Sequence, residues 1–219
     1  TMIDSYPQVY NLGHKAIVDL LKDPVVVQEK IDGSQFSFGL FQEPTGGYFD
    51  CNQHVVSMRS KGCKVTPENP GMFKLAAEAV EARRDLLTPG YIYRGEFLAK
   101  PKHNALAYDR TPKDNIILYD IQRGTGDFLS PVEMELEANR IELETVPFFQ
   151  ITLGSCLTME RFQELLEKVS VLGGQLVEGI VIKNYHRFGF DAKPLFGKYV
   201  SAKFKEVHAK EWKNQNPGG

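Results

Sequence analysis

The chain has 219 residues, of which 42% are hydrophobic, so it can bury one large core. Its 26 Lys and Arg residues stand against 28 Asp and Glu residues, and the net charge of -2 excludes a global attraction to a polyanion. Three cysteines without C-x-x-C spacing argue against a disulfide framework and structural zinc, and no apolar run is long enough to span a membrane. These features predict a soluble, cytoplasmic monomer with no membrane partner, formed by a single domain over residues 1–219.

The first predicted elements lie before residue 42. Residues 13–22 place their apolar side chains on one helical face, and Pro24 ends that pattern, so a short helix is predicted. The β-branched residues 25–28 and the alternating residues 36–41 predict two strands, and EKIDGS at 29–34 predicts a tight turn between them.

The remaining elements alternate irregularly between strand and helix. Ser130 with Glu133 forms a capping box around Pro131, and Thr158 can cap a helix that extends through Leu166. The other predicted elements are a helix at 71–87 and strands at 91–99, 115–122, 176–185 and 197–205. Because the βαβα rhythm of a doubly wound sheet is missing, we predict an α+β fold of antiparallel β-sheets flanked by helices.

The segment Glu29-Lys30-Ile31-Asp32-Gly33-Ser34 places a lysine at the mouth of a turn in an apolar region. Partial desolvation and nearby cations favour the neutral lysine amine, which is the form that attacks phosphorus. Gly33 lets the backbone approach a ligand closely, and backbone N–H groups in such a turn can bind phosphate. Taken alone, the segment could equally be an ordinary polar hairpin, because Asp-Gly is a common turn signal.

Four further segments place charged groups in apolar strands, where charge is costly unless it is paired or used. They are SMRSKG at 57–62, YRGEF at 93–97, VEGIVIK at 177–183 and KFK at 203–205. The last predicts two lysines on one face of a strand. Each segment alone has an ordinary structural explanation. Together they supply a nucleophile, two carboxylates for a divalent metal and cations for a triphosphate, which nucleotidyl transfer requires.

In this order the segments resemble the motifs of the covalent nucleotidyltransferases, the superfamily of DNA ligases, RNA ligases and mRNA capping enzymes. EKIDGS resembles motif I, SMRSKG a motif between I and III, YRGEFL motif III, NIILYDIQ motif IIIa, VEGIVIK motif IV and KYVSAKFK motif V. The resemblance covers roughly residues 25–205. Glu29 before the motif I lysine resembles the RNA ligase branch typified by the second RNA ligase of phage T4 and the kinetoplastid editing ligases. Gln35 stands where that branch usually carries Asn.

The resemblance implies an ATP-dependent RNA ligase that forms a ligase-AMP intermediate, passes AMP to a 5′-phosphate RNA end and seals it to a 3′-hydroxyl. It implies that Lys30 carries the AMP, that Glu29 lies against adenine, that Tyr119 stacks on the base and that Glu96 holds the ribose. Arg59 would contact ribose or phosphate. The other nucleotide-binding positions that it implies are Ile31, Ser34, Glu178, Lys203 and Lys205.

The resemblance also implies a metal site and an RNA contact. Glu96 and Glu178 would hold Mg²⁺ or Mn²⁺, because these cations prefer oxygen ligands. Glu178, Lys203 and Lys205 would join Lys30 as catalytic residues, whereas Gln35 and Lys183 would contact substrate RNA. A phage-encoded enzyme of RNA repair fits this branch.

Two groups of alternatives remain open. A DNA ligase or a GTP-dependent capping enzyme belongs to the same superfamily, but the sequence ends soon after Lys205, so we expect no complete C-terminal accessory domain such as an OB-fold. A non-catalytic RNA-binding module would use the basic residues that gather near the C-terminus, with stacking aromatic residues such as Phe188, Phe190, Phe196 and Tyr199. Such a module would have no need for Lys30 and Glu178.

Overall fold

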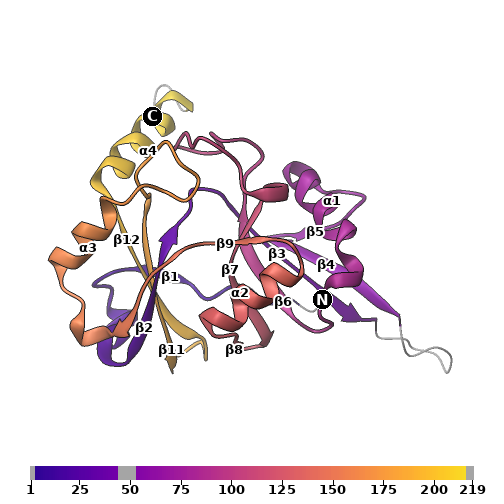
Figure 1. Ribbon diagram of the computed structural model, residues 1–219, viewed down its shortest axis with the longest axis horizontal. Helices are drawn as coiled ribbons and strands as arrows, with labels where there is room; N and C mark the ends of the chain where they lie inside the picture. Colours follow the sequence, from indigo (N-terminus) through magenta and orange to yellow (C-terminus); the bar gives the residue numbers. More distant parts are fainter. Residues whose placement is uncertain (1–2, 44–52, 216–219) are drawn as a thin grey trace. The chain divides into compact units, whose positions relative to one another are not determined.

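The computed structural model describes residues 3–43 and 53–215, and contacts divide it into two compact units. Unit 1 comprises Thr1–Tyr6, Ser34–Ala99 and Pro112–Thr145, and unit 2 comprises Pro7–Gly33, Lys100–Thr111 and Val146–Gly219. The chain therefore passes from unit 2 to unit 1 inside the EKIDGS segment, between Gly33 and Ser34. Figure 1 labels the elements of both units. Whether the whole chain forms one domain stays a prediction.

Unit 1 contains a seven-stranded sheet in the order β5-β4-β3-β6-β7-β8, with β9 paired to β7. Its strands are β3 (Ser34–Gln42), β4 (His54–Ser60), β5 (Lys64–Val65), β6 (Ile92–Phe97), β7 (Ile116–Gly124), β8 (Asp127–Phe128) and β9 (Glu144–Thr145). All pairs are antiparallel except β7 with β9.

Two α-helices accompany this sheet, α1 (Lys74–Ala82) and α2 (Pro131–Arg140). Three 3₁₀ turns lie beside them, η3 (Gly71–Phe73), η4 (Arg84–Leu86) and η5 (Lys113–Asn115). Aromatic rings fill the core: Phe73 stacks on Phe36 at 5.4 Å between centroids, and Phe38 stacks on Tyr93 at 5.0 Å. The Ser130 hydroxyl accepts the Glu133 N–H at the start of α2, which confirms the N-cap half of the predicted capping box.

Unit 2 contains a five-stranded sheet in the order β1-β12-β11-β2-β10. Its strands are β1 (Val9–Asn11), β2 (Pro24–Lys30), β10 (Phe148–Leu153), β11 (Gly179–Phe188) and β12 (Pro194–Val200). Only β1 and β12 pair in parallel. Figure 1 shows β2, β11 and β12 side by side although they are far apart in the sequence.

The helices of unit 2 are α3 (Met159–Leu166) and α4 (Ala202–Gln215), with 3₁₀ turns η1 (Lys15–Ile17), η2 (Leu20–Lys22) and η6 (Gly154–Cys156). Phe162 and Leu165 of α3 pack on Val25, Val27 and Ile182 of the sheet. The Thr158 hydroxyl accepts the Arg161 N–H at 3.1 Å, which confirms the predicted cap.

Two local predictions were wrong. Residues 13–22 form the separate turns η1 and η2 instead of one helix, and this break lets Ile17 and Leu20 both pack where Gly197 has no side chain. The hairpin interpretation of EKIDGS was also wrong, because β2 and β3 belong to different sheets. The predicted α+β class with antiparallel sheets is confirmed. The alternation of apolar and polar residues along the sequence determines the register in which the strands of a sheet pair.

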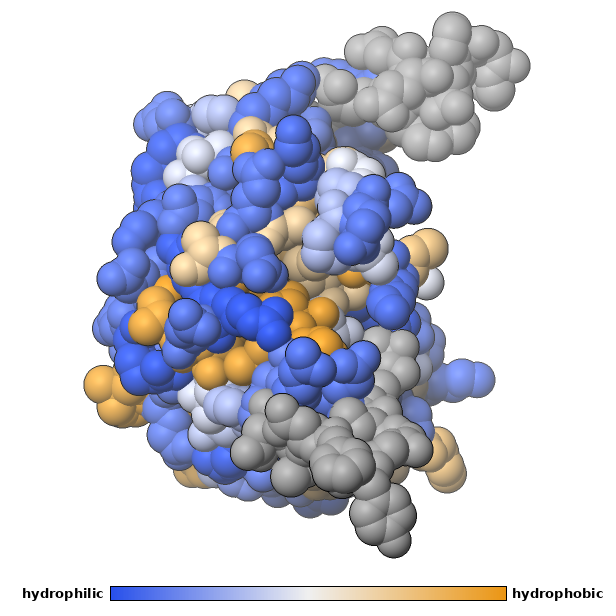
Figure 2. Space-filling model, turned by 90° about the vertical axis from the view of Figure 1, so that its right-hand side faces the viewer, coloured by the Kyte–Doolittle hydropathy of each residue, from blue (hydrophilic) through white to orange (hydrophobic). Residues whose placement is uncertain are grey.

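The face shown in Figure 2 is largely hydrophilic, and hydrophobic residues gather near its middle. No helix among the described residues has the length and apolar character that crossing a membrane requires.

Candidate active site

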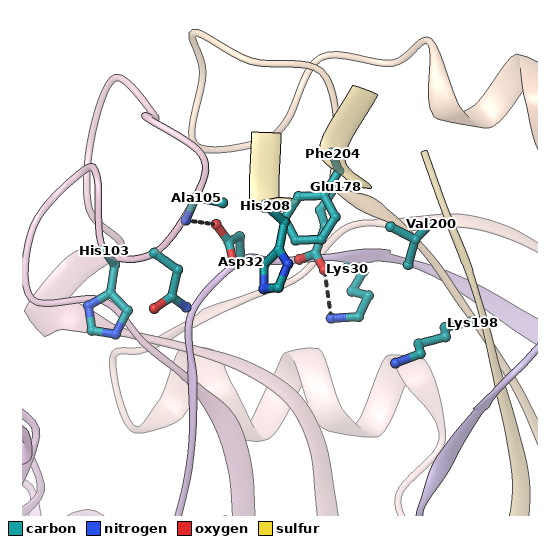
Figure 3. Close-up of a pocket in the computed structure, with 10 residues that line it drawn as sticks. Lys30, Asp32, His103, Ala105, Glu178, Lys198, Val200, Phe204 and His208 are labelled. Atoms are coloured by element: carbon teal, nitrogen blue, oxygen red, sulfur yellow. Dashed lines mark hydrogen bonds and ion pairs between the residues drawn. The ribbon is translucent and has the colours of Figure 1, made fainter. Parts of the chain in front are cut away.

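Lys30 is the last residue of β2, and the register of the sheet places it beside the start of β11. Gly179 pairs with Lys30 on one side and with Val200 of β12 on the other. Glu178 directly precedes this glycine, and its Oε1 lies 3.0 Å from the Lys30 Nζ (Figure 3). A Cβ on Gly179 would lie 2.5 Å from the Tyr199 carbonyl oxygen, so only glycine lets the three strands meet here.

The Glu178 carboxylate is buried at 4% exposure. Burial raises its pKa above the ordinary value, and the neighbouring Lys30 opposes that shift. Oε2 of Glu178 has no hydrogen-bond partner among the described residues. A buried carboxylate oxygen without a partner is costly, so this atom fits a cation or another donor that a ligand brings.

Asp32 connects the loop at residues 100–111 to the turn that follows Lys30. Its Oδ2 accepts the N–H groups of Ala105 and Leu106, each at 2.8 Å, and its own N–H donates to the Tyr108 hydroxyl at 2.9 Å. The Asn104 amide donates to the Gly33 carbonyl at 2.8 Å. Four hydrogen bonds therefore connect one turn with one loop, which makes the turn geometry depend on Asp32.

A cavity of about 580 Å³ in unit 2 opens around the Lys30 side chain. Figure 3 shows its lining, and Phe204 and His208 extend into it from α4. The lining residues are Lys30, Asp32, His103, Asn104, Ala105, Glu178, Lys198, Val200, Phe204 and His208. The cavity therefore brings together the lysine, two carboxylates and a second lysine, Lys198.

The prediction that Lys203 and Lys205 share one face of a strand was wrong. The strand β12 ends at Val200, and both lysines lie in α4, where residues two apart point in different directions. The Ser201 hydroxyl accepts the Phe204 N–H at 3.1 Å and caps this helix. Lys205 is exposed and does not line the cavity, and the Lys203 side chain lies outside the described part of the structure.

Glu29 points away from solvent and is 2% exposed. Its Oε2 accepts the Val171 N–H at 3.0 Å, and the Ser170 hydroxyl adds a second bond to the carboxylate. Burial raises the pKa of Glu29, and these two hydrogen bonds oppose the shift. Its Oε1 has no hydrogen-bond partner among the described residues, so Glu29 can still accept a donor from a ligand. Ile31, the next predicted nucleotide contact, is also buried.

Lys183 does not belong to an exposed basic surface, because it is 1% exposed. Its ammonium lies 5.4 Å from the centroid of the Phe196 ring, a distance that suits a cation–π contact. Arg187, another residue of the basic C-terminal region, forms an ion pair with Asp23. Lys183 and Arg187 are therefore both held by neighbouring side chains.

Tyr119 of unit 1 lies in a β-bulge. Arg94 pairs with Asp120 and the next residue, Gly95, pairs with Leu118, so Tyr119 is the extra residue of β7. A Cβ on Gly95 would lie 2.6 Å from the Ile117 carbonyl oxygen, so the strand opposite the bulge needs glycine. Bulges re-aim side chains and are common beside functional sites.

The neighbours of Tyr119 on the same sheet include two further predicted site residues. The Gln35 amide donates to the Tyr119 hydroxyl at 2.9 Å. Burial raises the pKa of Tyr119, and the negative charge of Glu96 adds to the shift. Ser34 precedes Gln35 at the start of β3, and Glu96 pairs with Gln35 across β3 and β6. Unit 1 therefore brings Gln35, Glu96 and Tyr119 together.

Arg59 of β4, the remaining predicted nucleotide contact, donates from Nη1 to the Ile3 carbonyl oxygen at 3.0 Å. Its side chain is partly exposed, so it can still reach a ligand. Arg59 thus contributes a cation to unit 1.

Sequence reasoning gave no role to several residues of the cavity. His103 and His208 stand in segments whose local patterns contain no motif for a ligand, and Lys198 is the first residue of the KYVSAKFK motif but was given no individual role. Asp32 was part of a quoted motif, but its partners Ala105 and Leu106 are more than 70 positions away. The start of α4 is the part of this site that the sequence could have predicted, because Ser201 is a favourable N-cap residue.

Comparison with known proteins gives a family and a fold. The family model described as RNA ligase matches residues 23–204. No curated protein matches the chain. The solved structure of Naegleria gruberi RNA ligase with PPi has a TM-score of 0.61 and 14% sequence identity, covering 95% of this chain and 58% of that one. A mutant of that enzyme with ATP and Mn has a TM-score of 0.62 and 14% identity, covering 94% and 58%.

The chain spans 58% of the length of these solved structures. At this level of identity the likeness shows a shared fold, which agrees with the antiparallel α+β architecture.

Proposed function

The chain belongs to the RNA ligase family, and from this premise we propose that it is an ATP-dependent RNA ligase whose nucleophile is Lys30. One observation carries the proposal: the Lys30 amine lies 3.0 Å from the buried Glu178 carboxylate in an open cavity. A lysine amine placed this way has a partner that orients it and room for a nucleotide beside it. Covalent catalysis by lysine requires both conditions.

In the first step, Nζ of Lys30 forms a bond to the α-phosphorus of ATP. The bond from that phosphorus to the oxygen bridging to the β-phosphate breaks, and pyrophosphate leaves with the bonding electrons. The ammonium of Lys30 must lose a proton before the attack, and Oε1 of Glu178, 3.0 Å from Nζ, is within reach to accept it. AMP then passes to a 5′-phosphate RNA end, and a 3′-hydroxyl attacks to seal the strand and release AMP.

The donor atoms of the cavity fit a divalent cation. Mg²⁺ is commonly held by one or two carboxylates together with substrate phosphates and waters, and Oε2 of Glu178 is a buried carboxylate oxygen without a described partner. When bound, Mg²⁺ or Mn²⁺ would neutralise phosphate charge. Glu178 would hold it from unit 2, and Glu96 of unit 1 is the second carboxylate that we propose for metal binding.

The remaining roles concern phosphates and the base. Lys198 lines the cavity beside Lys30 and is placed to neutralise a phosphate, a role that we also propose for Lys203 and Lys205. We propose that Tyr119 stacks on the adenine. Additional nucleotide contacts are proposed for Glu29, Ile31, Ser34, Arg59 and Glu96.

The solved relatives support the choice of nucleotide and metal, because Naegleria gruberi RNA ligase mutants are described with ATP and Mn and with AMP and Mn. We propose that this chain uses ATP with Mg²⁺ or Mn²⁺ and acts as a monomer on RNA with 5′-phosphate and 3′-hydroxyl ends. Gln35 and Lys183 are the proposed RNA contacts. For Lys183 such a contact would require exposure of a buried side chain.

The test is transfer of label from ATP labelled at the α-phosphate to the protein, followed under denaturing conditions. Lys30→Ala should abolish labelling, because it removes the amine that lies 3.0 Å from the Glu178 carboxylate. Lys22→Ala removes an exposed lysine of the same unit and should leave labelling intact.

Label retained by Lys30→Ala would refute the assignment. Labelling of the unaltered protein by GTP instead of ATP would favour the capping enzyme. RNA binding without any labelling would favour the non-catalytic module.

A further inference from the structure

Four residues at the N-terminus of unit 1, Ile3–Tyr6, bind side chains of its sheet, and we call this segment the N-terminal strap. The Tyr6 hydroxyl donates to the Asp120 carboxylate, and the Tyr6 and Tyr119 rings meet edge-on at 5.0 Å with an angle of 70°. Asp120 and Tyr119 are adjacent residues of the β7 bulge. Tyr6 therefore contacts the side chain of the bulged residue, Tyr119, and the side chain of the next residue, Asp120.

Arg94 holds the strap in place. It is 1% exposed and donates to the Asp4 carbonyl and to the Asp4 Oδ1, each at 2.9 Å. Its remaining donors bind Gln122 at 2.7 Å and Ser37 at 3.2 Å, and its guanidinium lies 5.7 Å from the centroid of the Tyr6 ring. A buried arginine that donates from all three of its nitrogens holds its partners in one geometry.

The strap also reaches Arg59, whose Nη1 donates to the Ile3 carbonyl oxygen at 3.0 Å. Tyr119 is fixed from a second side by Gln35, which donates to its hydroxyl. The strap thus contacts both Arg59 and Tyr119, two residues proposed to bind the nucleotide.

We propose that Tyr6 is a positioning residue for ATP binding, which holds the Tyr119 ring in the orientation that stacks on adenine. The inference rests on the proposed function, because it assumes that Tyr119 contacts the base. A ring held in advance loses less conformational freedom when the ligand binds, so its restraint appears as affinity for ATP. Tyr6 itself need not touch the nucleotide.

The experiment measures the rate of self-adenylylation against ATP concentration for Tyr6→Leu, Tyr119→Leu and the double variant. Tyr6→Leu should raise the half-saturating ATP concentration about 10-fold and leave the maximal rate within about 3-fold, as lost preorganisation predicts. If Tyr6 acts through Tyr119, the double variant should show little more than the effect of Tyr119→Leu. Tyr91→Leu, which removes a ring of unit 1 away from Tyr119, is the matched control and should change neither value.

Additive effects of Tyr6→Leu and Tyr119→Leu, or an unchanged half-saturating concentration in Tyr6→Leu, would overturn the proposal. Tyr6→Phe keeps the ring and loses the hydrogen bond to Asp120, so it should raise the half-saturating ATP concentration about 3-fold, less than Tyr6→Leu does. If Tyr6→Leu does not fold, a rise of about 3-fold in Tyr6→Phe that is confined to ATP affinity supports the proposal, and an unchanged half-saturating concentration refutes it. An unaltered protein that takes no label from ATP would instead refute the proposed function itself.

Discussion

The region around Lys30 in unit 2 and the region around Tyr119 in unit 1 differ in how their central side chains are held. Around Lys30, one oxygen of Glu178 and one of Glu29 are buried without a partner among the described residues. Around Tyr119, Gln35 binds the Tyr119 hydroxyl, Tyr6 binds Asp120 and Arg94 uses all three of its nitrogens. Oε2 of Glu96 in the second region is likewise a buried oxygen that accepts no hydrogen bond from the described residues, so the regions differ in another way: the Tyr119 ring is held by Gln35 and Tyr6, whereas Lys30 has its ion pair with Glu178 and an open cavity.

This difference indicates a division of labour. Unsatisfied buried oxygens cost stability and are retained where charge will arrive, so changes around Lys30 should lower the rate of the chemical step. Gln35 and Tyr6 hold the Tyr119 ring in one orientation, so changes around Tyr119 should lower the affinity for ATP. This comparison is supported if changes around Lys30 lower mainly the maximal rate and changes around Tyr119 raise mainly the half-saturating ATP concentration.

The largest effect after loss of the nucleophile is expected at Glu178. Glu178→Gln keeps the shape but removes the charge that orients the Lys30 amine, so the maximal rate of self-adenylylation should fall about 100-fold or more. Single-turnover labelling measures this rate. Glu164→Gln, an exposed glutamate of the same unit, is the control. A loss smaller than about 3-fold would show that the ion pair has no catalytic role.

A smaller effect, of a different kind, is expected at Tyr119. Stacking of a base on an aromatic ring contributes about 1–3 kcal/mol, so Tyr119→Leu should raise the half-saturating ATP concentration roughly 5- to 150-fold. The maximal rate should remain nearly unchanged. If Tyr119→Leu lowered the maximal rate and left the half-saturating ATP concentration unchanged, the proposed difference between the two regions would be wrong.

The smallest effect concerns stability at Glu29. Burial raises the Glu29 pKa in the folded protein, so the folded state binds this proton more tightly than the unfolded state does, and stability is lost as pH rises through the folded pKa. Gln does not titrate. Glu29→Gln should therefore be more stable than the parent by about 1 kcal/mol at neutral pH, with the difference shrinking as the pH falls through the raised folded pKa toward the ordinary pKa of glutamate.

Urea unfolding of Glu29→Gln at several pH values measures this difference. The same variant should bind ATP more weakly, since Glu29 is a proposed adenine contact. A loss of stability at neutral pH would show that Glu29 is a structural residue with satisfied interactions.

Local rules in the sequence were sufficient for most elements. Alternation and β-branching located β2, β3, β6 and β7, and the caps at Ser130 and Thr158 are confirmed by their hydrogen bonds. The same rules failed at residues 203–205, where Lys-Phe-Lys alternates like a strand but follows a capping serine. They also failed at residues 13–22, where packing against Gly197 favours two short turns.

The sequence by itself determined which residue types are available: one lysine in an apolar turn, glutamates beside glycines and an aromatic residue in a strand. Only the tertiary structure decided which of them meet. Glu178 reaches Lys30 because β2 and β11 pair in one register, and Asp32 finds its partners in a loop more than 70 positions away. Such contacts depend on chain closure over long distances, which local propensity does not encode.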